Sequence, residues 1–149
     1  LHDALPSSPK PQNPTESIFL NYNKMQNTQM IQAELNKWLA YVNYGQYTNF
    51  VVHQATQLLV AFPNFKPCVE SMQYPGEQGP SNLLMFKGQV KAGSDMFAIK
   101  IILINGFPYR APKAYVDQQL NSAIIKAKTY LGAQNEITLP YLTGWNMSN

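Results

Sequence analysis

The side chains of this sequence that could carry out chemistry are few and widely spaced. There is one cysteine, Cys68, with two histidines, His2 and His53, and eight acidic residues among 149. No cysteine, aspartate or glutamate lies at ligand spacing from His53, and no two acidic residues share a context suited to acid–base catalysis. One cysteine and two histidines cannot supply the four ligands of a Cys/His zinc site. We therefore predict no catalytic residue and no metal site.

The composition also argues against several classes of ligand. No glycine-rich loop leads from a strand into a helix, so the sequence predicts no phosphate cradle and no cofactor. The eleven lysines and arginines give a net charge of +3, but they are scattered singly, which is not typical of a nucleic-acid surface. No apolar run reaches the roughly eighteen residues of a membrane span. The expected partners are therefore other protein chains.

The elements that would position a binding site begin with two predicted helices behind a proline-rich tail. Residues 1–26 contain LPSSPKPQNPTES, which has four prolines and little to bury, so composition predicts a disordered tail. Asn27 or Thr28 is expected to cap a helix that ends at Gly45, and a second helix is predicted after Thr48. The first helix carries apolar residues at helical spacing, namely Ile31, Leu35, Trp38, Leu39 and Val42.

Four strands are predicted from residue 68 onward. CVESMQY (68–74) and AYVD (114–117) are the first and the fourth, and LLMFKGQV (83–90) and FAIKIILI (97–104) form a hairpin between them. Hydrophobic residues alternate along the third strand and predict one buried face. That face consists of Phe97, Ile99, Ile101 and Leu103. The order predicts an α+β fold with N-terminal helices on a four-stranded antiparallel meander.

Two blocks of proline and aromatic residues follow the predicted strands. The first is Phe107-Pro108-Tyr109, with Pro112 after two further residues, and the second has the pattern Ile-x-Leu-Pro-Tyr-Leu-x-x-Trp. The residues of the second block are Ile137, Leu139, Pro140, Tyr141, Leu142 and Trp145. A proline flanked by aromatic rings can fix a chain reversal against a sheet without any ligand. Taken by themselves, most of these residues are therefore predicted to be structural.

In this order, behind these helices and strands, the two blocks resemble the ubiquitin-conjugating enzyme variant (UEV) domain of the ESCRT-I sorting subunit. The resemblance implies a ubiquitin-conjugating-enzyme-like fold. Active enzymes of that fold carry a cysteine that takes ubiquitin as a thioester, and the corresponding position here is Thr138. The His-Pro-Asn stretch that supplies the oxyanion donor corresponds to Tyr130, Leu131 and Gly132. The resemblance therefore implies that the chain is not an enzyme.

The same resemblance implies two kinds of ligand, ubiquitin and Pro-Thr-Ala-Pro peptides. The two tyrosines and the methionine of the peptide groove correspond to residues 90–92, Asp95 and Ala123, so none of the three is retained. The aromatic residue of the ubiquitin surface corresponds to Tyr115, and Tyr74 matches an aromatic position before the first hairpin turn. We name Tyr74 and Tyr115 as candidate binding residues, each of which could instead serve packing.

We expect a proline-rich tail over residues 1–26 and a UEV-like domain over residues 27–149 that lacks the C-terminal helices of the fold. One hypothesis is a non-catalytic binding or scaffold module that recognises ubiquitin or a proline-rich peptide in cytoplasmic or endosomal protein sorting. The alternative is a structural accessory subunit of a large complex, such as a mitochondrial one, in which neighbouring subunits cover the exposed apolar surface.

Overall fold

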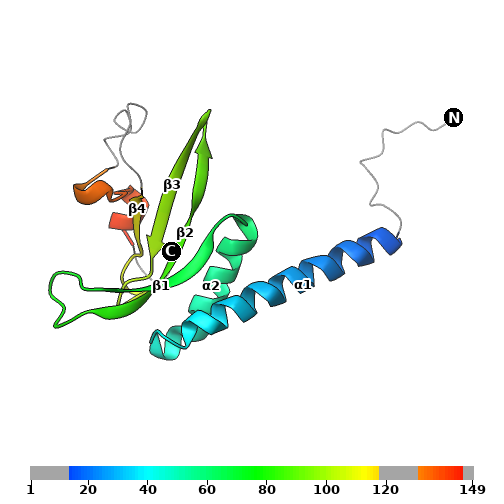
Figure 1. The fold of residues 1–149 in the computed structure, drawn as a ribbon, viewed down its shortest axis with the longest axis horizontal. Coiled ribbons are helices and arrows are strands. Elements are labelled where there is room, and N and C mark those ends of the chain that lie inside the picture. Colours follow the sequence, from blue (N-terminus) through cyan, green and yellow to red (C-terminus); the bar gives the residue numbers. More distant parts are fainter. Residues whose placement is uncertain (1–13, 118–130, 146–149) are drawn as a thin grey trace.

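The computed structural model describes residues 14–117 and 131–145. Two helices precede the sheet, α1 (Pro14–Leu39) and α2 (Thr48–Ala61), with the short turn η1 (Gly45–Tyr47) between them (Figure 1). The strands are β1 (Lys66–Met72), β2 (Ser81–Ala92), β3 (Asp95–Ile102) and β4 (Lys113–Val116). After β4 come the short elements η3 (Ala133–Asn135) and α4 (Pro140–Thr143).

The four strands form one antiparallel sheet in the order β1-β2-β3-β4. β2 and β3 form the predicted hairpin, in which Ala92 is paired with Asp95. Gly93 in the turn has φ +65°, a conformation that glycine adopts at little cost. The α+β class, with N-terminal helices on a four-stranded meander, is therefore confirmed.

The first helix begins thirteen residues earlier than its predicted caps, since α1 starts at Pro14 instead of Asn27. Proline is well suited to the first turn of a helix, because its missing N–H would have no partner there, and Glu16 is favourable at the same end. Thr28 lies inside the helix, where its hydroxyl donates to the Lys24 carbonyl at 3.0 Å. The prediction of a disordered tail is thus wrong for residues 14–26. Residues 1–13 lie outside the described residues, and the domain boundary at residue 27 stays a prediction.

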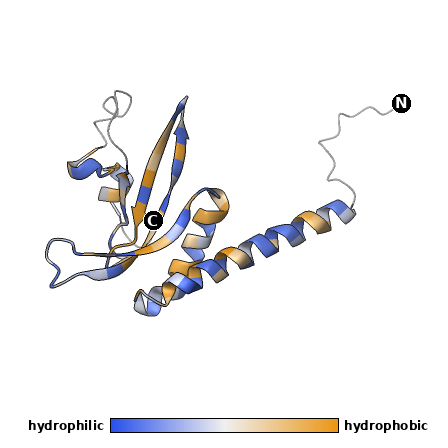
Figure 2. Ribbon diagram, in the orientation of Figure 1, coloured by the Kyte–Doolittle hydropathy of each residue, from blue (hydrophilic) through white to orange (hydrophobic). Residues whose placement is uncertain are grey.

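The C-terminal half of α1 and the whole of α2 cover one face of the sheet (Figure 1). Leu35 of α1 and Val51 of α2 are fully buried there against Leu84 and Phe86 of β2. Tyr44, between the two helices, donates its hydroxyl proton to the Leu103 carbonyl at 2.6 Å and accepts the Leu84 N–H at 2.9 Å. These contacts hold the helical layer over the centre of the sheet, where hydrophobic residues concentrate (Figure 2).

The predicted buried face of β3 is buried only at one end. Leu103 has 6% of its surface exposed, whereas Phe97, Ile99 and Ile101 are only half-buried. The helices pack mainly over β1 and β2, so the part of this sheet face formed by β3 and β4 is less covered. The opposite face carries a second hydrophobic cluster around Leu83, Met85, Ile102, Ile104 and Tyr115.

Candidate functional site

The two proline–aromatic blocks of the sequence meet in space. The indole N–H of Trp145 donates to the Pro108 carbonyl at 2.7 Å, and the Trp145 ring lies 6.1 Å from that of Phe107. Phe107 and Pro108 are both buried, and the peptide bond between them is cis. Tyr141 packs edge-on against Trp145, with ring centroids 5.5 Å apart. This corner joins the segment around α4 to the loop after β3, and Trp145 packs there on Phe107 and Pro108.

The remaining residues of the two blocks lie around this corner with different exposures. Tyr109 is exposed, and its hydroxyl is hydrogen-bonded to that of Tyr47. Pro112 is half-buried just before β4, and Pro140 is the first residue of α4. Leu139 is exposed and, like Tyr141, lies beside the apolar surface formed by β3 and β4.

A cleft lies beside this corner, next to β4. Thr138 lines it together with Arg110, Pro112 and Trp145. At its edge, Lys113 and Glu136 form an ion pair with 3.1 Å between Nζ and Oε2. Among residues 14–117 and 131–145, no three histidine, cysteine or acidic side chains are grouped in a way that could hold a metal ion. The cleft thus offers polar contacts, and neither cysteine nor histidine is among the described residues that line it.

Cys68 does not supply that nucleophile from elsewhere. It lies in β1 opposite Met85, on the sheet face away from the helices. Burial is the main cause that raises the pKa of its thiol, and the nearby Lys87 opposes this only in part. A raised pKa keeps the sulfur in its unreactive protonated form at neutral pH.

The two candidate binding residues are brought together on that same face. Their hydroxyl oxygens lie 3.2 Å apart, although the residues are 41 positions apart in sequence. Tyr115 is only 8% exposed and belongs to the cluster, while Tyr74 is half-buried at its rim. Burial, followed by the hydrogen bond to Tyr115, raises the pKa of the Tyr74 hydroxyl. Lys100 Nζ lies 5.4 Å from the centre of the Tyr115 ring. Tyr74 is therefore the more accessible of the two.

The turn after Tyr74 is held by residues that the sequence analysis did not identify. The Glu77 carboxylate accepts the Tyr74 N–H at 3.3 Å and the Asn105 side-chain amide at 2.7 Å. The same amide donates to the Ser81 hydroxyl at 2.8 Å. The sequence offered one signal for this role, which was an acidic residue, Glu77, in a turn rich in glycine and proline. Its partner Asn105 is 28 positions away, so the contact could not be predicted from the sequence. These bonds keep the exposed Pro75-Gly76 turn close to the Tyr74–Tyr115 pair.

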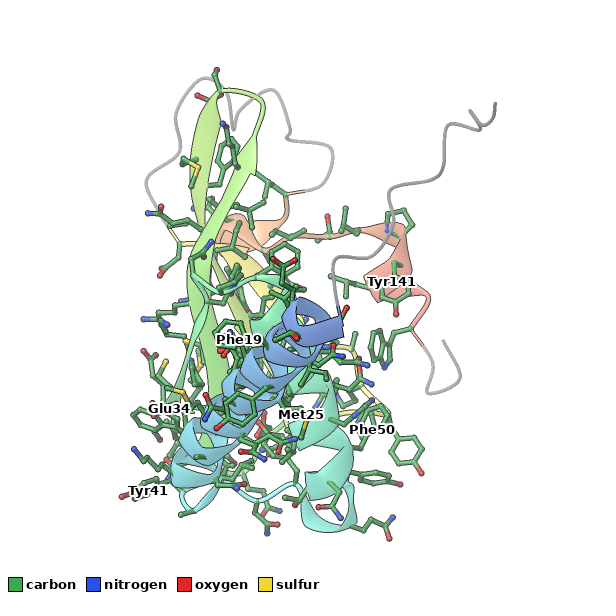
Figure 3. All side chains as sticks on the ribbon, turned by 90° about the vertical axis from the view of Figure 1, so that its right-hand side faces the viewer. Phe19, Met25, Glu34, Tyr41, Phe50 and Tyr141 are labelled. Carbon is green, nitrogen blue, oxygen red and sulfur yellow. The ribbon has the colours of Figure 1, made fainter. Side chains whose placement is uncertain are left out.

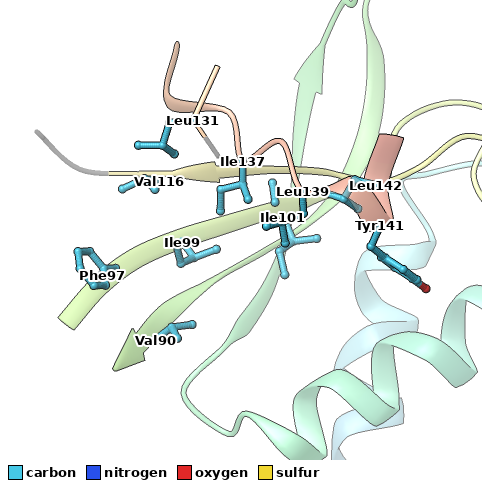
Figure 4. A pocket seen from close by; sticks show the side chains of 11 residues that line it. Val90, Phe97, Ile99, Ile101, Val116, Leu131, Ile137, Leu139, Tyr141 and Leu142 are labelled. Carbon is cyan, nitrogen blue, oxygen red and sulfur yellow. The ribbon is translucent and has the colours of Figure 1, made fainter. Parts of the chain in front are cut away.

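An apolar groove was also missed in the sequence analysis. It has a volume of about 430 Å³ and lies over β3 and β4, on the face that the helices cover elsewhere (Figure 4). Every residue that lines it is hydrophobic. They are Val90, Phe97, Ile99, Ile101, Ala114, Val116, Leu131, Ile137, Leu139, Tyr141 and Leu142. The only polar side-chain atom among them is the Tyr141 hydroxyl, so this groove is suited to an apolar ligand segment.

The meander, the segregated helices and the two joined proline–aromatic blocks define a ubiquitin-conjugating-like fold. Residues 35–149 match the UEV domain family, and the chain belongs to it. UEV domains are catalytically inactive variants of ubiquitin-conjugating enzymes, so the chain is of the non-catalytic class.

Solved structures support the same fold. The yeast Vps23 UEV domain in complex with a Vps27 PSDP peptide has a TM-score of 0.63 at 17% identity, over 80% of each chain. A complex of the Vps23 UEV with ubiquitin gives 0.62 at 15% identity, over 83% of each chain. No curated protein sequence matches the chain. Among the described residues, no helix has the length and hydrophobicity needed to span a membrane.

Proposed function

We propose that this chain is a non-catalytic UEV module that binds ubiquitin or a short proline-containing peptide in cytoplasmic or endosomal protein sorting. The observation that supports the proposal is the UEV family match together with the corner that joins Trp145 to Phe107 and Pro108, and we place Thr138 at the reactive position. Thioester transfer needs a thiolate, because a hydroxyl group is far less acidic and no described histidine lies in the cleft to activate it. Without thioester transfer, we propose that the function of this domain is to bind other proteins.

The face around Tyr74 and Tyr115 is the proposed contact surface for ubiquitin. It combines the half-buried Tyr74 with an exposed turn held by hydrogen bonds, and a buried hydrophobic cluster supports both from below. Aromatic residues with one polar atom are well suited to protein interfaces, since they bury a large area at low entropic cost. One of the similar structures is a Vps23 UEV bound to ubiquitin, which favours this choice of ligand.

The apolar groove favours a proline-containing peptide as a second ligand. Proline rings and aliphatic side chains pack well on a concave hydrophobic wall, and an extended peptide with few backbone donors needs few polar partners there. The similar yeast domain is bound to a PSDP peptide. The tyrosines of the known peptide groove are absent from the hairpin, so we expect recognition here to depend on shape and hydrophobicity.

Titration of the isotope-labelled chain with ubiquitin, followed by amide chemical shifts, tests the first ligand. We expect shifts around Tyr74 and the 75–77 turn, and loss of binding in Tyr74→Ala. Ile99→Ala, in the groove on the opposite side of the sheet, is the matched control and should bind ubiquitin unchanged. Absence of any shift at millimolar ubiquitin would contradict the assignment.

The peptide proposal is tested by the reciprocal experiment. A proline-rich peptide should shift amides of β3 and α4, and Ile99→Ala should weaken it while Tyr74→Ala does not. Thr138→Ala should leave both titrations unchanged, since Thr138 lies outside both proposed contact surfaces. Loss of either ligand in that variant would show that the cleft takes part in binding.

Failure of both titrations would favour the alternative, an accessory subunit of a larger assembly. Its specific support is the exposure of Tyr141 at the corner, at 56%, which a neighbouring chain could cover. The comparisons give no support to a mitochondrial location for such an assembly.

A further inference from the structure

The N-terminal half of α1 extends away from the rest of the domain (Figure 1). Large hydrophobic side chains between residues 18 and 30 of this helix are between 56% and 72% exposed. They are Ile18, Phe19, Leu20, Tyr22, Met25 and Met30. Phe19 and Met25 are seen on this projecting part in Figure 3. An exposed set of this size on one helix is unusual for a chain that acts alone.

The helix carries two hydrophobic stripes on different faces. Ile31, Leu35 and Leu39 recur every four residues and pack on the domain. Ile18, Tyr22 and Met25 follow the alternating spacing of four and three that defines the core of a two-stranded coiled coil. At 100° per residue, this second stripe is rotated by roughly a third of a turn from the first. It therefore cannot be satisfied by the domain of its own chain. We call Ile18, Tyr22 and Met25 the free seam.

The residues beside the free seam indicate what it can pair with. The positions that flank a coiled-coil core are Phe19, Asn21, Gln26 and Thr28, and none is charged. Coiled coils between different chains are commonly specified by opposite charges at these positions, and like charges there prevent self-pairing. The flanking positions of the free seam have no charges of either kind, so they neither require a different chain nor prevent self-pairing. A lipid surface would instead require a polar face rich in lysine and arginine, but residues 15–30 contain only Lys24.

We propose that the free seam pairs with that of a second copy of this chain in an antiparallel, two-fold α1–α1 contact. Because the domain is attached to the C-terminal half of α1, an antiparallel pair places the two domains at opposite ends and avoids their collision. In the register that we propose, Ile18 of one copy lies opposite Tyr22 of the other. The exposed surface of Ile18, Phe19, Tyr22 and Met25 is roughly 500 Å² per copy, so the pair would bury on the order of 1,000 Å². This is the lower limit for a specific contact, so a weak, concentration-dependent dimer is expected.

Sedimentation of the full chain over a micromolar to millimolar concentration series tests the contact. We expect a reversible monomer–dimer equilibrium that Tyr22→Glu and Met25→Ala each weaken by about tenfold or more. Met30→Glu is the matched control, because Met30 is exposed on the same helix but lies outside the free seam and its flanks. Circular dichroism measures the helix content of each variant. If Tyr22→Glu has lost helix, it is replaced by Tyr22→Ala, because alanine favours the helix.

Cysteine cross-linking tests the orientation. A mixture of Ile18→Cys and Tyr22→Cys chains, each in a Cys68→Ala background, should form mixed disulfide dimers faster than either variant alone. Faster cross-linking of Tyr22→Cys with itself would overturn the pairing of Ile18 with Tyr22. A chain that stays monomeric at millimolar concentration, that responds equally to Met30→Glu, or that remains monomeric but binds anionic vesicles would overturn the proposal. None of these outcomes depends on ubiquitin or peptide binding, so this proposal and the proposed function can fail separately.

Discussion

The hydroxyl group of Tyr44 connects the helical layer to β2 and to the residue that follows β3. It donates to the carbonyl of Leu103 and accepts from the amide of Leu84, and its side chain is buried. Burial raises the pKa of this hydroxyl to about 12, although the Leu84 hydrogen bond acts in the opposite direction. The native state therefore keeps Tyr44 neutral under conditions in which an exposed tyrosine ionises.

Tyr44→Phe should lower the free energy of unfolding by about 1–3 kcal/mol at neutral pH, because the Leu84 amide loses its partner in a buried place. Urea denaturation measures this loss. The folded-state pKa exceeds the unfolded value of about 10, so the stabilisation is complete below pH 10 and declines as pH rises toward 12. The phenylalanine variant should show a shallower decline over that range. An equal decline in both proteins would contradict the role given to Tyr44.

Gly88 occupies a place in β2 where no larger residue fits. A Cβ atom there would lie 2.4 Å from Cδ1 of Phe65 and 2.7 Å from Oδ1 of Asn64. The Asn64 oxygen is held in place, since it accepts the Gln89 N–H at 2.8 Å. Neither neighbour can retreat without losing a packing contact or a hydrogen bond.

Gly88→Ala is expected to destabilise the chain by about 1–3 kcal/mol, the usual cost of overpacking. The control is Gly79→Ala, because nothing lies within 4 Å of a Cβ at that position. Its effect should stay within about 0.5 kcal/mol. Thermal unfolding of the two variants side by side tests the comparison, and a Gly79 effect as large as that at Gly88 would count against the packing explanation.

At the scale of elements, the corner formed by α4 and the loop after β3 depends on one tryptophan. Trp145 is half-buried, so its removal should cost less than that of a fully buried ring, about 2–4 kcal/mol. Trp145→Phe should recover part of this, because a tilted ring contact with Phe107 is retained while the N–H donor to Pro108 is lost. Tyr141→Ala, at an exposed position, should cost under about 1 kcal/mol. Denaturant midpoints of the three variants would rank them, and a silent Trp145→Ala would refute the structural role of the corner.

The strands and the hairpin were predictable because alternation and turn chemistry are local signals. The start of α1 was not, since prolines at residues 6–14 lowered the apparent order of a stretch whose following residues are compatible with a helix. The uncovered end of β3 was also unpredictable, because its apolar side chains look the same in sequence whether or not a helix lies over them. The proximity of Tyr74 to Tyr115 and of Glu77 to Asn105 depends on tertiary contacts alone.

At the scale of the whole molecule, the two proposed ligand faces lie on opposite sides of the sheet. The Tyr74–Tyr115 pair is on the side away from the helices, and the apolar groove is on the helical side. A ligand on one face therefore leaves the other accessible, and simultaneous binding of ubiquitin and a peptide is geometrically permitted. A titration of the peptide into the ubiquitin-saturated chain should give the same affinity as with the free chain.

The projecting half of α1 also affects the size and shape of the molecule in solution. A helix of 26 residues is about 39 Å long, and only its C-terminal half is packed on the domain. A compact chain of this length would have a radius of gyration of roughly 15 Å. Small-angle scattering extrapolated to zero concentration should give a clearly larger value and an asymmetric pair-distance distribution. Because the free end lies far from the packed half, even a small change in the direction of the helix would displace that end by a large distance.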